Sequence, residues 1–368
     1  MRDLDKFKGC IVGGSVGDAL GYAVEFQSIY EIHERYGYGG ITKFELENSI
    51  AKISDDTQML LFTAAGLLTG TTNLIVDNMM SSYIEFLRDA YLDWYKTQTE
   101  SYPLEGEVHS WLLNERDLFY QRSPGRTCLS ALSKGGEGTI QNPINNSKGC
   151  GGVMRVAPIG LYFSGKDINV EEVVMLGAES AALTHGHTLG YISAGFLTNM
   201  IFLLSQNNNM TILESVKSSM NTIEKLFPST HQKRLNSLIE KAISLSNQNI
   251  KDIDAISILG EGWVAEETLA IAIYSSLKYE NDFEKAIIAS VNHSGDSDST
   301  GSVTGNIMGT HLGFNKIPNK YLENLDLLDV QIEIATDLYN DVQLNDDTTI
   351  NREWKEKYVD TTYKTKEQ

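Results

Sequence analysis

Apolar residues recur at three- and four-residue spacing along most of the chain, which is the pattern of helices that bury one face. Strict alternation, the pattern of half-buried strands, is scarce, and only residues 41–46 (ITKFEL) hint at an extended stretch. The pattern therefore predicts a mainly helical protein. Its clearest helical segments are residues 55–69, 172–184, 189–205, 212–227, 234–246, 263–279 and 282–292.

The segments between these predicted helices contain no long linker. Polar stretches at 97–109, 133–149 and 205–211 have the composition of loops inserted between helices. No run rich in Pro, Gly and Ser divides the chain, and Pro accounts for only 6 of the 368 residues. We therefore predict one compact helical domain over residues 1–340, followed by a polar C-terminal tail at 341–368.

Two series of glycines at opposite ends of the chain repeat every four residues. On a helix this spacing places them nearly on one face, although each glycine costs about 1 kcal/mol relative to alanine. Close approach of two helix backbones is the usual compensation. We predict that helices near 8–21 and 300–313 pack tightly in the centre of the fold and bring the chain ends together at one site. The two series are Gly9, Gly13, Gly17 and Gly21, and Gly301, Gly305, Gly309 and Gly313.

The chain is strongly acidic, with 49 Asp and Glu against 30 Lys and Arg and a formal net charge of −19. We expect no nucleic-acid partner, because neutralising phosphates requires clustered Lys and Arg and the sequence contains no such cluster. A surplus of carboxylates is compatible with divalent cations. The hydrophobic share of 41% is enough for a large core.

Nothing in the sequence predicts export or a membrane span. The first residues (MRDLDKFK) lack the apolar run of a secretory signal. The longest apolar stretch, 189–204, is short for a span and carries Asn199 near its middle, which favours a buried core helix. The three cysteines are odd in number and show no CxxC spacing. A reduced, cytoplasmic protein fits these features best, and we expect a monomer.

Two acidic clusters each precede a helical run. Ser54, Asp55 and Asp56 have an ordinary explanation in helix capping, because a serine oxygen accepts from the first free N–H groups and acids favour the positive helix end. The second cluster, HSGDSDSTG at 293–301, adds Asp296 and Asp298 together with several hydroxyls. Clusters that offer only oxygen ligands suit hard cations such as Mg²⁺ or Mn²⁺.

Several familiar sites are excluded by their spacing. An EF-hand that begins at Asp296 would need a bidentate Glu where Ile307 stands. His185 and His187 lack a Cys or Glu at the spacing of a zinc site, and structural capping explains such histidines as well. The sequence also contains no G-x-S-x-G elbow, no G-x-G-x-x-G after a strand and no Walker loop.

The segment 148–158 (KGCGGVMRVAP) is a candidate anion site. Consecutive glycines free backbone N–H groups to face an anion, and a helix is expected to begin just after them. A flexible loop explains the same composition equally well.

Seven stretches of the chain together resemble the ADP-ribosylglycohydrolase family, whose best-known bacterial member reactivates dinitrogenase reductase. They follow the family order from residue 9 to about residue 313, and seven matches in register are far more specific than one. Residues 205–256 and those after 340 carry no such signature, so we interpret 205–256 as a family-variable helical region. The stretches are GGSVGDALGYAVEF (13–26), SDDTQMLLFTAAGLL (54–68), SPGRTCLSAL (123–132), SKGCGGVMRVAPIG (147–160), THGHTLGYISAG (184–195), GEGWVAEETLAIAIY (260–274) and VNHSGDSDSTGSVTGNIMG (291–309).

The resemblance implies a single orthogonal all-α domain, with two Mg²⁺ or Mn²⁺ ions at the base of a central cleft for ADP-ribose. Glu25 matches the family's glutamate beside the metals, which would orient a metal-bound water or relay a proton to the leaving group. The residues that match metal-binding positions are Ser54, Asp55 and Asp56 for one ion, and Asp296, Asp298 and Ser299 for the other, with Asp298 bridging. On the substrate side, Gly149, Cys150, Gly151, Gly152 and Met154 match the diphosphate loop and His185 matches a substrate-side histidine.

This chain departs from the family pattern at 123–126 (SPGR), where relatives often have Asp at the first position and Asn at the fourth. The departure concerns the choice of target more than the glycosidic chemistry. The metal-binding positions also differ slightly, since relatives often have Thr where Ser54 and Ser299 stand, and a hydroxyl is kept at both.

The resemblance implies hydrolysis of an N- or O-glycosidic bond between ADP-ribose and an amino-acid side chain, with arginine as the first candidate. The partners would be an ADP-ribosylated protein and the product ADP-ribose. Two settings fit this activity: reversal of a cell's own regulatory modification, and immunity against an ADP-ribosylating toxin.

Two other functions are weighed against this one. A non-catalytic descendant that binds ADP-ribose or serves as a structural protein would be expected to lose clustered carboxylates, because they repel one another without a cation. Glu25 and all four Asp remain, which favours an enzyme. A two-metal phosphoesterase would cleave the diphosphate instead, and it would release AMP and ribose phosphate rather than intact ADP-ribose.

Overall fold

The computed structural model describes residues 2–77, 82–104, 108–346 and 349–360, and in these residues the regular structure is helical apart from isolated bridges. The predicted all-α fold is confirmed. The α-helices are α1 (Leu4–Tyr22), α2 (Ile29–Tyr36), α3 (Asp55–Asp77), α4 (Tyr83–Thr99), α5 (Arg126–Leu132), α6 (Ala157–Phe163), α7 (Val170–Ala182), α8 (Thr188–Gln206), α9 (Ile212–Leu226), α10 (Thr230–Ser246), α11 (Asp252–Leu259), α12 (Ala265–Lys278), α13 (Phe283–Val291), α14 (Ser297–Leu312), α15 (Leu328–Asn340) and α16 (Arg352–Tyr358). Short 3₁₀-helices are η1 (Trp111–Asn114), η2 (Arg116–Leu118), η3 (Cys150–Gly152), η4 (Phe314–Lys316) and η5 (Asn319–Tyr321).

Each of the seven predicted helical segments corresponds to a helix, namely α3, α7, α8, α9, α10, α12 and α13. The expectation of extended structure at 41–46 is wrong, because these residues form no strand. Ile41 instead exchanges hydrogen bonds with a side chain. Its N–H donates to Asn292 Oδ1 at 2.7 Å, and its carbonyl accepts from Asn292 Nδ2 at 2.9 Å.

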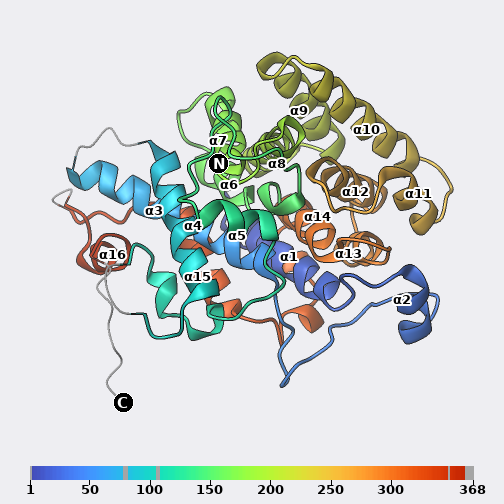
Figure 1. The fold of residues 1–368 in the computed structure, drawn as a ribbon, viewed down its shortest axis with the longest axis horizontal. Coiled ribbons are helices and arrows are strands. Elements are labelled where there is room, and N and C mark those ends of the chain that lie inside the picture. The colour runs from blue at the N-terminus through green and yellow to red at the C-terminus, as the bar shows by residue number, and fades with distance from the viewer. Residues whose placement is uncertain (1, 78–81, 105–107, 347–348, 361–368) are drawn as a thin grey trace.

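The glycine-bearing helices α1 and α14 lie antiparallel in the centre of the fold, as predicted (Figure 1). A Cβ atom on Gly305 would lie 1.9 Å from the Gly13 carbonyl oxygen, and one on Gly17 would lie 2.0 Å from the Gly301 carbonyl oxygen. Real Cβ atoms do not approach backbone that closely, so only glycine permits this separation. Because the pair is antiparallel, the C-terminal end of α1 meets the N-terminal end of α14.

One member of the second glycine series has a different role. Gly313 does not belong to α14 but ends it, with φ of +86° and its N–H bonded to the Gly309 carbonyl at 2.9 Å. Left-handed backbone of this kind is the usual reason for glycine at a helix C-terminus. The expected helix over 300–313 therefore stops one residue earlier.

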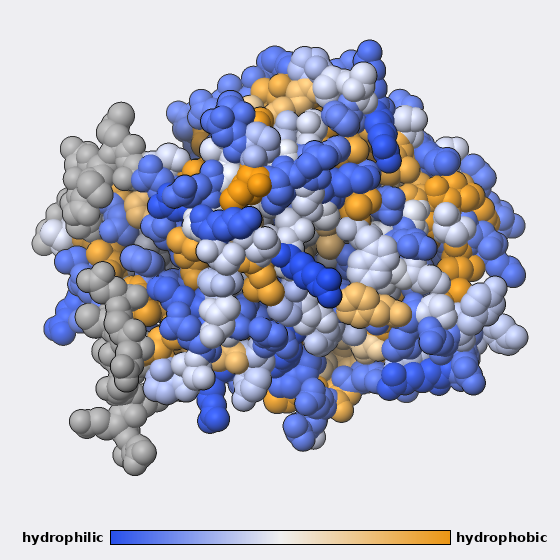
Figure 2. All heavy atoms as spheres, in the orientation of Figure 1, coloured by the Kyte–Doolittle hydropathy of each residue, from blue (hydrophilic) through white to orange (hydrophobic). Residues whose placement is uncertain are grey.

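The other helices cover this central pair. Helix α8 is long and apolar enough to cross a membrane by length and composition, but 89% of its apolar window is buried inside the protein, as expected of a core helix. Helices α9, α10 and α11 form an outer group at one side (Figure 1). On the face drawn in Figure 2, hydrophobic side chains form scattered patches among hydrophilic ones.

Part of the segment that the sequence sets apart as a polar tail packs on the helical body. Trp354, in α16, donates its Nε1–H to Thr72 of α3 at 3.0 Å, and the Tyr358 hydroxyl donates to Asp337 of α15 at 2.6 Å. Both aromatic side chains are buried. The domain boundary at residue 340 stays a prediction.

Candidate active site

A pocket of about 520 Å³ opens where the central helices meet. Its walls come from the residues after α1, the starts of α3 and α14, the segment 123–128, the loop 149–154 and the turn before α12. Two of the residues predicted for the site, Ser54 and Gly152, do not line it. The predicted residues that do line it are Glu25, Asp55, Asp56, Gly149, Cys150, Gly151, Met154, His185, Asp296, Asp298 and Ser299.

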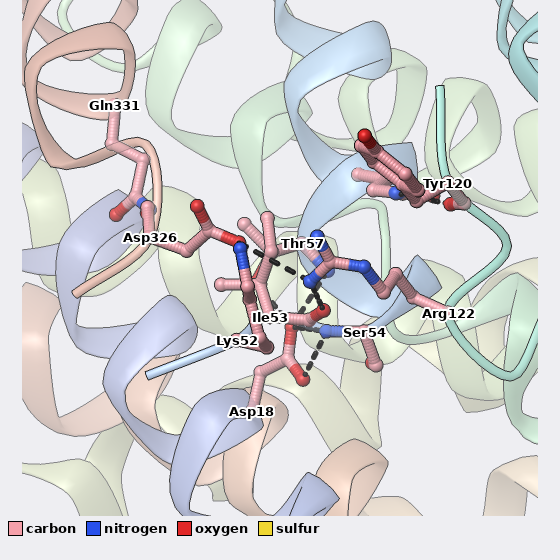
Figure 3. Close-up of polar contacts among 10 residues, drawn as sticks. Asp18, Lys52, Ile53, Ser54, Thr57, Tyr120, Arg122, Asp326 and Gln331 are labelled. Carbon is pink, nitrogen blue, oxygen red and sulfur yellow. Dashed lines mark hydrogen bonds and ion pairs between the residues drawn. The ribbon is translucent and has the colours of Figure 1, made fainter. Parts of the chain in front are cut away.

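The start of α3 is held by a carboxylate that the sequence analysis did not select. Asp18, in α1, is buried and accepts from the N–H groups of Ser54, at 3.0 Å, and Thr57, at 3.1 Å (Figure 3). Ser54 Oγ in turn accepts from the Asp56 N–H at 3.2 Å, so the capping role considered for Ser54 is observed. Asp18 thereby fixes the peptide that carries Asp55 and Asp56. Its position within the GDALG motif, as the one acid in the second half of α1, was the available signal.

Arg122 anchors the same segment from the other side (Figure 3). Its Nη1 donates to the Ile53 carbonyl at 3.2 Å and pairs with Asp326 at 3.2 Å. Its own carbonyl accepts from the Asp55 N–H at 2.9 Å. Lys52 reaches the same Asp326 carboxylate at 3.5 Å. These largely buried contacts hold the first residues of α3 in place.

The second acidic cluster is built around the N-terminus of α14. The Asp296 N–H donates to the Glu261 carbonyl at 2.8 Å, and Asp296 Oδ1 accepts from the Ser299 N–H at 3.4 Å. The Ser299 N–H also lies 2.9 Å from Asp298 Oδ1. On the pocket side, the Cys150 thiol donates to Asp296 Oδ2 at 2.8 Å. The Cys150 contact joins the glycine loop to the acidic cluster.

The two clusters and Glu25 converge on one point. Carboxylate oxygens of Glu25, Asp296 and Asp298 lie within 4.8 Å of one another. Burial, followed by the charges of Asp298 and Asp296, raises the pKa of Glu25 to about 10. Burial and the charge of Asp298 likewise raise the pKa of Asp18 to about 7. The charge of Asp298 therefore acts on both Glu25 and Asp18, and its bridging role stays a prediction.

The donor set fits divalent cations. Burial is the main cause that raises the pKa of Asp55 and Asp56 well above the usual range, and neighbouring carboxylates add to it. Two buried oxygens, Glu25 Oε2 and Asp56 Oδ1, have no hydrogen-bond partner. Buried acceptors without partners and like charges in contact are both costly, and a bound cation relieves both costs. Hydroxyl and carboxylate oxygens are the ligands that Mg²⁺ and Mn²⁺ prefer.

The glycine loop forms the opposite wall and packs tightly. A Cβ on Gly151 would lie 2.8 Å from Cys128 Sγ and 3.0 Å from His185 Cε1, so a larger residue would displace the loop. The loop is also tied to α12, because the Ala265 N–H donates to the Lys148 carbonyl at 2.9 Å. Gly149, Cys150 and Gly151 are therefore part of a packed wall, and the anion site considered for this loop stays a prediction.

Behind this loop lies a buried cation that the sequence analysis did not identify. Arg155 donates at 2.8 Å to both the Ser180 carbonyl and the Thr184 hydroxyl, and its guanidinium stacks 4.2 Å from the centre of the Tyr91 ring. His185 Nδ1 lies 2.8 Å from the same Thr184 hydroxyl. Burial, with a contribution from Arg155, lowers the pKa of His185 to about 3, so this histidine is neutral at pH 7.

Two aromatic rings and the segment 123–126, whose sequence departs from the family pattern, complete the pocket. The rings of Phe26 and Trp263 stack with centroids 5.3 Å apart and planes at 21°. The Gly125 N–H donates to Asp55 Oδ2 at 3.1 Å, so the segment also positions an acidic side chain. Phe26 directly follows Glu25, and that position was the signal that could have identified it.

Comparisons with known proteins identify the family of this chain. A family model described as ADP-ribosylglycohydrolase matches residues 1–348. The chain is 25% identical to ADP-ribosylhydrolase ARH3 of Homo sapiens over 88% of this chain and 90% of that protein. It is 25% identical to ADP-ribosylarginine hydrolase Tri1 of Serratia proteamaculans, over 88% of this chain and 76% of that protein.

A solved structure titled ADP-ribosylglycohydrolase-related protein complex has the same fold. It matches with a TM-score of 0.58 and 21% identity, and the match covers 92% of this chain and 98% of that one. At this identity the likeness concerns the fold alone.

Proposed function

This chain belongs to the ADP-ribosylglycohydrolase family, and from that premise we propose that it removes ADP-ribose from arginine side chains of a modified protein with the help of two divalent cations. The family and the enzyme class predicted from the motifs are confirmed. The observation that carries the proposal is the convergence of carboxylates from the segment after α1 and from the starts of α3 and α14 on one pocket, opposite a glycine loop.

The cations would be held by the two acidic clusters. We assign Ser54, Asp55 and Asp56 to one ion, and Asp296, Asp298 and Ser299 to the other, with Asp298 shared. When bound, Mg²⁺ or Mn²⁺ would polarise substrate oxygens and lower the pKa of a water molecule. Asp18 holds the backbone of the first cluster, and the Glu261 carbonyl holds that of the second.

Glu25 is the proposed proton carrier. Its Oε2 is buried, faces the pocket and has no hydrogen-bond partner. Bound cations would offset the neighbouring negative charges and lower its raised pKa, so that the carboxylate could take a proton from the attacking water or return one to the leaving group. The usual glycosidase pair of carboxylic acids is replaced by this single glutamate and the cluster. Neutral His185 and the loop 149–152 would receive the diphosphate, with the buried guanidinium of Arg155 near His185, through the Thr184 hydroxyl that both contact.

Arginine is the proposed acceptor for two reasons. One relative of this chain is named an ADP-ribosylarginine hydrolase. The pocket also presents several carboxylates and two exposed aromatic faces, which suit a planar cation better than a neutral hydroxyl side chain.

The biological setting is part of the proposal. We propose a cytoplasmic monomer, in keeping with three cysteines that are all free. Immunity against an ADP-ribosylating toxin and reversal of the cell's own modification both use the same chemistry, and genomic neighbours would separate them.

The test is release of ADP-ribose from an arginine-ADP-ribosylated protein with Mg²⁺, with Mn²⁺ and with EDTA. We expect intact ADP-ribose with either metal and none with EDTA. AMP and ribose phosphate would identify a phosphoesterase instead. No release from arginine-linked and then serine-linked substrates with any metal would indicate a non-catalytic member of the family.

A further inference from the structure

Two exposed aromatic rings stand beside the acidic end of the pocket, and the proposed chemistry does not use them. Phe26 is 69% exposed and Trp263 is 36% exposed, although both rank among the largest apolar side chains of the protein. Both line the pocket, and their rings stack at 5.3 Å. Large apolar faces exposed at the rim of a polar pocket commonly mark a binding surface.

Phe26 is held outward by an unfavourable backbone conformation. Its φ of +64° lies in the left-handed region, which a bulky residue rarely occupies without compensation. The chain is pinned on both sides, by the Gln27 N–H to the Val24 carbonyl at 3.0 Å and the Ile29 N–H to Ser294 Oγ at 2.8 Å. The turn lets Glu25 and Phe26 both line the pocket from adjacent positions.

Trp263 is fixed by the same backbone that carries the acids. The Thr268 hydroxyl donates to the Gly262 carbonyl at 2.6 Å, and the preceding residue, Glu261, accepts from the Asp296 N–H. A Cβ on Gly262 would lie 2.8 Å from Thr300 Cγ2, so the turn is packed directly on α14. The indole therefore has a fixed place relative to Asp296.

The position of the rings indicates which part of a substrate they meet. In an ADP-ribosylated side chain the bond to be cut lies at one ribose carbon, and the adenine is separated from it by two riboses and a diphosphate. Phe26 adjoins Glu25, the group assigned to that bond, so the ring lies at the acceptor end rather than at the adenine end. A planar cation attached at that carbon would meet these two aromatic faces.

We propose that Phe26 and Trp263 form an acceptor subsite that binds the guanidinium plane of the modified arginine and sets the preference for arginine over hydroxyl acceptors. The inference rests on the proposed function and names the residues that give it specificity. A guanidinium stacks on an aromatic face and keeps its hydrogen-bond donors free in its own plane for carboxylates. A serine-linked substrate offers no such face.

The first experiment measures binding of small cations to the protein without turnover, in the presence of Mn²⁺ and saturating ADP-ribose. The probe is n-butylguanidinium, and n-butylammonium is the matched non-planar cation. Quenching of Trp263 fluorescence is the readout, because the other three tryptophans are buried. We expect n-butylguanidinium to bind about tenfold more tightly than n-butylammonium. Both variants lack this tryptophan, so their binding is followed by calorimetry. Trp263→Leu should abolish the difference in affinity between the two cations, whereas Trp263→Phe, which keeps an aromatic face, should retain most of it.

The second experiment uses turnover and ADP-ribose affinity. Trp263→Leu and Phe26→Leu should raise KM for an arginine-linked substrate about tenfold with little change in kcat, and should leave the Kd for ADP-ribose unchanged. Tyr30→Leu, which removes a ring that is 82% exposed and does not line this pocket, is the control. An increase in the Kd for ADP-ribose in both variants would assign the rings to the adenine and overturn the proposal.

The two experiments separate failure of the subsite from failure of the proposed function. If the wild-type enzyme does not cleave arginine-linked substrates, the proposed function fails, while the binding comparison still decides the subsite. Equal affinities of wild type and Trp263→Leu for n-butylguanidinium overturn the subsite even if turnover is as proposed.

Discussion

Helices α1 and α14 serve two regions with opposite physical character. In their central interface no space is left, since a Cβ on Gly305 or Gly309 would lie 1.9 Å from a carbonyl oxygen of the other helix. At the end of the same interface a pocket of about 520 Å³ is lined by carboxylates, and two of their buried oxygens have no hydrogen-bond partner. The contrast shows how a site of mutually repelling charges stays assembled: the tight interface prevents the two acid-bearing helix ends from separating.

The largest effect is expected in the pocket, from Asp296→Asn. The substitution keeps the shape of the side chain but removes a charge assigned to one of the two cations, so kcat should fall by about 10³-fold, or about 4 kcal/mol. ADP-ribose release measures this loss, and helical circular dichroism should be unchanged. Stabilisation of the wild type by Mn²⁺, followed as a shift in Tm, should be much smaller in the variant.

The matched control for this prediction is Asp282→Asn. Asp282 caps α13 by accepting from the Lys285 N–H at 3.1 Å, and asparagine caps helices equally well. Activity and stability of this variant should stay near those of the wild type. Full activity in Asp296→Asn would contradict the metal assignment.

The next effect tests the interface itself. Gly305→Ala should lower the free energy of unfolding by about 3 kcal/mol, because a single methyl group forces two backbones apart. Urea unfolding measures this change. Gly39→Ala is the control, since a Cβ at that position meets nothing within 4 Å. Equal stabilities of these two variants would show that the helices can separate freely, against the role assigned to the glycines.

A smaller effect, on the pH dependence of stability, is expected where the tight interface meets the pocket. His293 is buried and contacts Thr300 of α14 through Nε2 at 2.9 Å, and burial lowers its pKa to about 4. The unfolded chain binds the proton near pH 6.5 and the folded protein does not, so the stability due to neutral His293 is lost as pH falls from 6.5 towards 4. Between pH 7.5 and 5.0 the wild type should lose about 2 kcal/mol more than His293→Gln.

Urea unfolding of both proteins at the two pH values measures this difference. Only the change in the free energy of unfolding between the two pH values is compared, so any constant cost of the substitution cancels. The clustered carboxylates contribute with the opposite sign, and their contribution cancels because it is common to both proteins. Parallel losses in the two proteins would mean that His293 takes up its proton without opening the fold.

The smallest effect sharpens the description of the pocket. Cys150→Ser keeps a donor to Asp296 and should change kcat/KM by less than about threefold. Cys150→Ala removes one hydrogen-bond donor to that carboxylate, which should cost about 1 kcal/mol and lower kcat/KM about fivefold. Steady-state kinetics distinguishes the two variants, and equal activities would mean that the thiol contact does not contribute to catalysis.

Some of the fold could be predicted because its signal is local. Apolar spacing identified α8 and α12, and the four-residue glycine repeat predicted the central pair. Helix α4 was not among the predicted segments, although Leu87, Tyr91 and Trp94 have helical spacing and are buried. The end of α14 at Gly313 depended on a single left-handed residue rather than on a periodic pattern.

For the site, motifs identified most of the lining residues but not those that position them. Asp18, Arg122 and Arg155 act through hydrogen bonds to groups more than twenty residues away, and no spacing in the sequence reports such contacts. The aromatic pair is missed for the same reason. Phe26 and Trp263 are 237 positions apart in the sequence and become neighbours only in the folded chain.

The sequence by itself determined the helical class, the central position of the two glycine-bearing helices and the residue types of the site, because each depends on the order and spacing of nearby residues. Only the tertiary structure decided that Ser54 and Gly152 do not line the pocket, that the carboxylates of Glu25, Asp296 and Asp298 lie close together and that two aromatic rings stack in the pocket wall. Those outcomes depend on the antiparallel contact of α1 and α14, which brings chain segments almost 300 residues apart to one point. The carboxylates of these segments then lie in a confined space, where water screens their charges only in part.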